Sequence, residues 1–246
     1  MDYESYKTCM HVNTKWSKLL KSDAYQKKAK SVFQNEILED HQRLWTAARS
    51  GNYSCARQLL SYEMLDINYI YGGRGFLGIC WRKTTFRKTT VLFEASWGGH
   101  MKVVSLLIDA GADIDKTDYQ GWTALHIASL KGHKCVAQLL IDRGADINMT
   151  DIFGQTALHV AACWGRKSMV EFLLERGSRI DTYDTKGWTP LTEAVIQGKT
   201  SMVKMLLEKG ARPKTSNENF LERVALNNGN MDIMKLLRQF RARSIQ

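Results

Sequence analysis

The feature that most constrains this chain is a segment that occurs four times in tandem. One copy reads GWTALHIASLKGHKCVAQLLIDRGADINMTD, and its neighbours share most of its apolar and glycine positions. The glycine in the middle of each copy recurs every 33 residues, at Gly99, Gly132, Gly165 and Gly198. Repeats of this length stack so that each one contacts only its neighbours. The sequence therefore predicts an elongated solenoid with one continuous core.

A single copy, taken from Asp118 to Thr150, predicts two helices. The hydroxyl of Thr123 can cap the first helix, and Gly132 can end it in the left-handed conformation. Apolar residues at helical spacing are expected to face the core: Leu125, Ile127 and Ala128 in the first helix, and Val136, Leu139 and Leu140 in the second.

The period, the TxLHxA pattern near each start and the LLxxGAD pattern near each end resemble the ankyrin repeat. The resemblance implies an all-α solenoid of about six helix-turn-helix repeats with short hairpin turns. Four copies are regular, and the repeats around Gly51 and Gly229 look like degenerate ends. Two departures stand out: Lys88 lies where a turn glycine is expected, and Thr192 lies where other copies have His or Phe.

The expected organisation is a helical extension over residues 1–40 and a repeat domain over residues 41–246. A long insertion at about 71–86 replaces the hairpin between the first two repeats, and a C-terminal cap covers about 216–246. Apolar residues in the extension recur at helical spacing. They fit either packing against the first repeat or a separate partner-binding helix.

Composition and charge indicate a compartment and a kind of partner. No apolar run approaches a membrane span. Five cysteines without a CxxC pair are typical of a reducing compartment, so we expect a cytoplasmic or nuclear protein. The net charge of +10 is uneven: residues 71–90 carry five basic groups and no acid, and residues 184–246 carry a further net +5. This distribution favours a localised, acidic partner.

The insertion interleaves basic and aromatic residues, including Arg74, Trp81 and Arg82. This composition fits a binding loop for a protein or for single-stranded nucleic acid, and it also fits a solvated loop. Its GxGxxG pattern at 73–78 lacks the strand, helix and downstream acid of a dinucleotide site, so we expect no cofactor there.

No residue set predicts catalysis or a metal centre. His159 and Cys163 are spaced i, i+4, but no second pair of ligands accompanies them, so core packing is the favoured interpretation. The resemblance implies that His126 and His159 hydrogen-bond to neighbouring backbone. It also implies a binding module without enzymatic activity.

In ankyrin-like proteins, partners bind the turn tips and the exposed side of the first helices, on the concave face. Carried over by position, the resemblance implies partner contacts at Trp97, Tyr119, Trp122, Leu130, Lys131, Phe153, Trp164, Lys186 and Trp188, helped by the insertion. Exposed tryptophans along one face are typical of binding hot spots. The alternative is that Trp122 and Trp188 merely cover the turns.

The function expected from these observations is that of an adaptor, scaffold or regulatory subunit that binds a protein. The alternative is a polyanion- or nucleic-acid-binding protein that uses the insertion and the basic C-terminal end. Asn148 and Asn68 each follow a leucine by eight residues, which resembles the ankyrin sequence modified by an asparaginyl hydroxylase.

Overall fold

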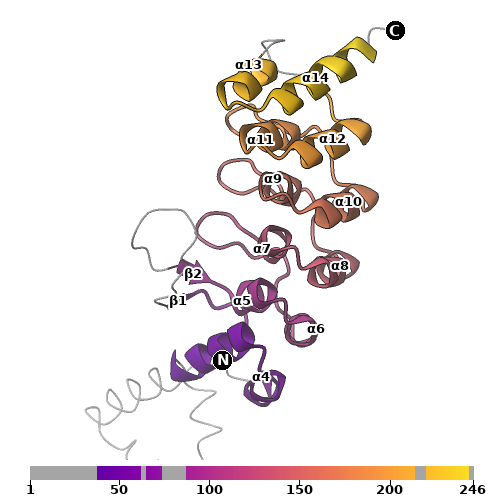
Figure 1. Ribbon diagram of the computed structural model, residues 1–246. Helices are drawn as coiled ribbons and strands as arrows, with labels where there is room; N and C mark the ends of the chain where they lie inside the picture. The colour runs from indigo at the N-terminus through magenta and orange to yellow at the C-terminus, as the bar shows by residue number, and fades with distance from the viewer. Residues whose placement is uncertain (1–37, 62–64, 74–86, 214–219, 244–246) are drawn as a thin grey trace, which may run out of the picture.

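The computed structural model describes residues 38–61, 65–73, 87–213 and 220–243. These residues form a single stack of helix pairs (Figure 1), as the repeat period predicts. Residues 38–50 are helical. The other elements are α4 (Tyr53–Leu60), β1 (Tyr71–Gly73), β2 (Arg87–Thr89), α5 (Val91–Gly98), α6 (Met101–Asp109), α7 (Ala124–Lys131), α8 (Lys134–Asp142), α9 (Ala157–Cys163), α10 (Lys167–Glu175), α11 (Pro190–Ile196), α12 (Thr200–Glu208), α13 (Phe220–Asn227) and α14 (Met231–Arg243).

The predicted start and stop signals of the helices are confirmed. Thr123 is the N-cap of α7, and its Oγ1 accepts the backbone N–H of His126 at 3.4 Å. Gly132 is the C-cap of the same helix, with φ at 78°. Left-handed backbone costs glycine little, so the chain can reverse here into α8.

The apolar pattern packs as one core along the stack. The predicted core positions of α7 are buried, and so are Val136 and Leu140 of α8. Leu139, predicted in the same stripe, is only half-buried. In the regular repeats the first helices contact one another, α5 with α7, α7 with α9 and α9 with α11. The first helices therefore form one row and the second helices another (Figure 1).

Two buried histidines bind neighbouring repeats to each other. The Nε2 of His126 donates to the carbonyl of Gln155 at 3.0 Å, and that of His159 donates to the carbonyl of Trp188 at 3.1 Å. This confirms the structural role that the resemblance implied. Burial lowers the pKa of both imidazoles. Thr192 replaces the third histidine, and its hydroxyl lies 3.1 Å from that of Thr189 within one repeat.

The loops between repeats form a second ladder of bonds. At equivalent positions, an Asn or Asp side chain accepts a backbone N–H of the following repeat. The acceptors are Asn68, Asp115, Asn148 and Asp181, and the donors are the backbones of Asp113, Asp146, Arg179 and Arg212. Asp and Asn are therefore at these positions because they complete the hydrogen bonding of the next loop.

The insertion begins and ends in a small antiparallel sheet, an addition to the expected all-α architecture. Tyr71 pairs with Thr89, and Lys88 lies opposite Gly72. Lys88 therefore departs from the turn glycine because it is in a strand and not in a tight turn. Residues 74–86 lie outside the described part of the chain.

The two ends refine the predicted boundaries. The helix over residues 38–50 runs across the boundary placed at residue 40, so residues 38–40 belong to the helix of the first repeat. Residues 1–37 lie outside the described part. At the other end, α13 and α14 pack together as a final pair. In the described ranges no helix is both long and apolar enough to cross a bilayer.

Candidate functional site

The last turns of the first helices present a row of equivalent side chains, here called the first-helix surface. Its first column consists of Trp97, Leu130, Cys163 and Ile196, each half-buried. Because these residues are 33 positions apart, the stack places them one after another. The column is apolar, half-accessible and continuous over four repeats.

A second column of this surface includes Lys131 and Trp164. Trp164 is 38% exposed. The Nζ of Lys131 lies 3.7 Å from the centroid of the Trp97 ring. Desolvation, followed by repulsion from Arg166, lowers the pKa of Lys131. Trp97 therefore has one face engaged within the protein, whereas Trp164 offers more accessible surface.

The hairpin tips carry exposed aromatic residues, as the resemblance implied. Tyr119 is 47% exposed and Phe153 is 49% exposed. The tips are joined by backbone bonds, because Ile152 N donates to Gln120 O at 3.1 Å and Thr185 N to Phe153 O at 2.8 Å. Backbone hydrogen bonds between neighbouring hairpins thus hold these apolar side chains in place, which reduces the conformational entropy that would be lost on binding.

The two tip tryptophans have contacts within the stack. Trp122 is half-buried, and its Nε1 donates to Asp151 Oδ2 of the next turn at 3.1 Å. The ring of Trp188 lies under the Nζ of exposed Lys186, 4.4 Å from its centroid. The bond of Trp122 matches the alternative in which this residue covers a turn.

The remaining predicted residues divide between described and undescribed regions. Asn148 and Asn68 are half-buried, and their Oδ1 atoms accept N–H groups of Arg179 and Asp113 at 3.2 and 2.7 Å. The three insertion residues named above, Arg74, Trp81 and Arg82, lie outside the described residues.

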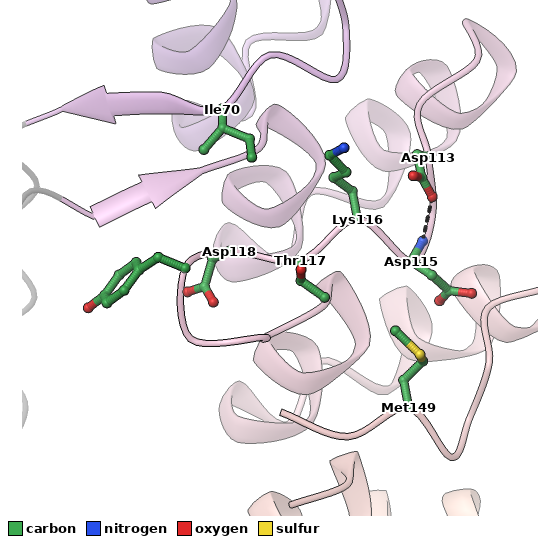
Figure 2. Close-up of a pocket in the computed structure, with 8 residues that line it drawn as sticks. Ile70, Asp113, Asp115, Lys116, Thr117, Asp118 and Met149 are labelled. Atoms are coloured by element: carbon green, nitrogen blue, oxygen red, sulfur yellow. Dashed lines mark hydrogen bonds between the residues drawn. The ribbon is translucent and has the colours of Figure 1, made fainter. Parts of the chain in front are cut away.

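An open pocket of about 440 Å³ lies between β1 and the loop that follows α6 (Figure 2). Its lining includes Asp113, Asp115 and Asp118. These carboxylates accept hydrogen bonds from backbone N–H groups of the turns. Asp113 accepts the N–H of Asp115, Asp115 that of Asp146, and Asp118 that of Trp122. Burial raises the pKa of Asp115. The pocket therefore reflects the predicted use of aspartates as turn formers.

The described part of the chain offers no metal-binding cluster, and the thiol of Cys163 is not activated. The described residues contain no group of three or more His, Cys, Asp or Glu residues that could hold a metal ion. Burial, with the nearby Glu193 carboxylate, raises the pKa of Cys163 to about 11. Cys163 is therefore a protonated thiol at neutral pH and a poor nucleophile.

Sequence reasoning missed two buried glutamates beside the first-helix surface. Glu94 and Glu193 are the fourth residues of α5 and α11, and they are 6% and 5% exposed. Ile127 and Val160 occupy the equivalent positions of α7 and α9. An acid at a position that is otherwise aliphatic was the available signal, and comparing the repeats column by column would have found it.

The family comparison agrees with this geometry. The family model described as "Ankyrin repeats (3 copies)" matches residues 44–151 and 144–217, and no other domain was found. No curated protein matches the chain. The matched residues span most of the chain and coincide with the stacked helix pairs. The chain belongs to the ankyrin-repeat family.

Proposed function

We propose that this chain binds a protein partner through the first-helix surface and the hairpin tips, as an adaptor, scaffold or regulatory subunit in the cytoplasm or nucleus. Ankyrin repeats are generally protein–protein interaction modules and are typically non-catalytic. The observation that carries the proposal is the set of exposed aromatic residues, Tyr119, Phe153 and Trp164, on one bonded scaffold. Accessible aromatic side chains on a pre-ordered surface are typical of binding hot spots.

The basic insertion extends this proposal toward an acidic partner. Arg74, Trp81 and Arg82 belong to the segment between β1 and β2, and that segment is basic without an acid. A positive segment in the same chain as an aromatic surface favours a partner whose own contact surface is acidic.

A double substitution, Phe153→Ala with Trp164→Ala, tests the first-helix surface and tips. The partner is first identified by crosslinking to the intact chain, and its affinity is then measured by calorimetry. We expect the affinity to fall by about 30-fold or more, because the loss of even one hot spot costs about 2 kcal/mol.

The matched control is Met101→Ala, which removes an apolar side chain of 48% exposure from the second helix α6. This variant should bind as the parent does. Equal affinity of a folded Phe153→Ala, Trp164→Ala protein and the parent would remove this surface from the proposal.

The second candidate function is binding to nucleic acid or another polyanion. Residues 71–90 and 184–246 each carry a net charge of +5 and favour it. In the described part, two C-terminal cations already contact an acid, because Glu222 pairs with Arg238 at 2.9 Å and Arg241 at 3.9 Å. Binding to a DNA or RNA oligonucleotide should weaken steeply with added salt if this function is correct. Binding that does not change with salt would exclude it.

We also propose Asn148 and Asn68 as sites of oxidative modification. Both side chains lie in loops between repeats, and each bonds to the following repeat. Intact-mass analysis of the protein from its native cells should show the mass of one added oxygen for each modified asparagine. Peptide mapping that finds both asparagines unmodified would contradict this proposal.

A further inference from the structure

The environment of Glu94 shows how this stack accommodates a buried carboxylate. The side chain is 7% exposed, and Oε1 accepts the hydroxyl of Thr89 at 2.9 Å. The Nε of Arg49, from the preceding repeat, lies 4.0 Å from Oε2. The Arg49 side chain is itself 35% exposed. A guanidinium at the surface therefore sits over a carboxylate in the interior, and both come from the same chain.

Glu193 occupies the equivalent position three repeats later without such a cation. Its Oε1 accepts the Nε2 of Gln155 at 2.9 Å. Arg49 lies two residues before the mid-repeat glycine of its repeat. In the repeat that precedes Glu193, the residue at this position is Cys163. Among the residues that the structure describes, no cation lies within ion-pair distance of Glu193.

The nearby charges do not replace that cation. Lys186 is close enough to act on Glu193, but its Nζ lies over the Trp188 ring at 4.4 Å. Lys199 lies near Cys163. Burial, followed by repulsion from Asp184, raises the pKa of Glu193. A carboxyl group kept in such a place costs stability, and proteins keep such groups mainly where they serve a function.

Asp184 supplies a second, independent sign of a missing donor. It is 7% exposed, and its buried Oδ2 has no hydrogen-bond partner within the described part of the chain. In the preceding turn the equivalent oxygen, Asp151 Oδ2, accepts the indole N–H of Trp122. Gln155 occupies the position equivalent to Trp122 one repeat later, where it could serve Asp184. Its amide donates to Glu193 instead. Asp184 Oδ1 accepts the backbone N–H groups of Lys186 and Trp188, each at 2.8 Å, so Oδ2 is the oxygen left without a donor beside the buried Glu193.

We propose that Glu193 and Asp184 receive an arginine side chain of the partner protein, which lies over Cys163 as Arg49 lies over Glu94. This inference rests on the proposed function, since it names one feature of the partner. The thiol of Cys163 lies within hydrogen-bonding reach of Glu193 but carries no charge, so it does not replace the cation that Arg49 supplies to Glu94.

Arginine fits this site better than lysine for two reasons. A guanidinium presents five N–H donors in a plane and can serve two carboxyl groups together, whereas an ammonium acts as a point charge. Trp164, next to Cys163 in the chain, also offers an exposed indole, and guanidinium groups stack on such rings.

The first test needs no partner. The probe is N-acetyl-arginine amide, and the readout is the pKa of Glu193 followed by carboxyl ¹³C NMR. We expect arginine amide to lower this pKa, while neutral N-acetyl-citrulline amide of the same shape leaves it unchanged. N-acetyl-lysine amide at the same ionic strength should lower it less. An equal pKa in all three solutions would overturn the proposal.

Two variants sharpen the test. Cys163→Arg places the cation in the same chain, so the pKa of Glu193 should fall without any probe and should no longer respond to arginine amide. In the control Glu94→Gln, where Arg49 already fills the equivalent place, the response of Glu193 to arginine amide should match that of the parent. If Cys163→Arg does not fold, Glu193→Gln replaces it, and the ¹³C signals of Asp184 should then respond to arginine amide less than in the parent.

A random peptide library displayed on phage separates this inference from the proposed function. Peptides selected on the parent chain should contain arginine more often than the unselected library, and their affinity should fall by about tenfold or more in Glu193→Gln. Selected peptides that need Trp164 but lack arginine would contradict the arginine site and leave the proposed function intact. No peptide binding, with a lowered pKa of Glu193 in arginine amide, would support the site and contradict the broader function.

Discussion

Gly121→Ala should be among the most damaging single substitutions in the chain. Gly121 has φ at +77°, and a Cβ there would lie 2.9 Å from the backbone nitrogen of Ile152 and 3.0 Å from the Cα of Asp151. Left-handed strain costs about 1–2 kcal/mol, and overpacking against a backbone that cannot yield adds about 1–3 kcal/mol. Urea unfolding followed by circular dichroism should therefore show a loss of about 2–5 kcal/mol.

Gly165→Ala is the matched control. Its φ is +69°, but the nearest atom to an added Cβ is the Cδ of the Lys199 side chain at 3.6 Å, an ordinary contact. This variant should show the conformational strain alone, about 1–2 kcal/mol. Equal losses in the two variants would mean that the close approach of neighbouring hairpins adds nothing to the role of Gly121.

Acid should destabilise the protein through His126 and His159. Burial lowers the pKa of both folded imidazoles below their unfolded value of about 6.5. The unfolded chain then binds more protons than the folded one below that pH. The stabilisation is thus complete above about pH 6.5 and declines as the pH falls toward the folded pKa, with a slope of up to about 1.4 kcal/mol per pH unit for each histidine.

The double variant His126→Thr, His159→Thr isolates this effect, because Thr192 shows that threonine fits the equivalent position. At about pH 7.5 it should be less stable than the parent, since two backbone carbonyls lose their donors at about 1–3 kcal/mol each. Between about pH 7 and 5 its stability should change less with pH than that of the parent. The raised pKa values of Asp115 and Glu193 act in the opposite direction in both proteins. Equal pH profiles would contradict the assignment to the histidines.

The sequence predicted the fold because the decisive signals are local and recur. A threonine cap before α7, a glycine after it and apolar residues at helical spacing need no knowledge of distant contacts. Leu139 was assigned to the core but is half-buried, since it lies at the edge of the apolar stripe of α8. A helix runs through residue 40 without a break in the polar and apolar pattern, so no local signal marks a boundary there.

The candidate site was less predictable, because its properties depend on pairs of side chains from different repeats. Spacing places Trp122 at a hairpin tip, but it does not show that the indole reaches Asp151 in the next turn. Spacing also places Lys131 beside Trp97 without showing the stacking between them. Glu193 escaped notice for the same reason: its burial depends on the packing of α11 against α9, which no single repeat reveals.

The ladder of hydrogen bonds formed by Asn68, Asp115, Asn148 and Asp181 predicts which repeats unfold first. Each of these side chains accepts a backbone N–H of the next repeat. In the described part of the chain, the second, third and fourth repeats are therefore held by a bond to each neighbour, and the first and fifth by only one. Opening should therefore start at the ends and move inward one repeat at a time. The amide protons of α7 to α10 would then exchange with solvent last, so the part of the chain that carries Trp164 and Phe153 stays closed while its ends open.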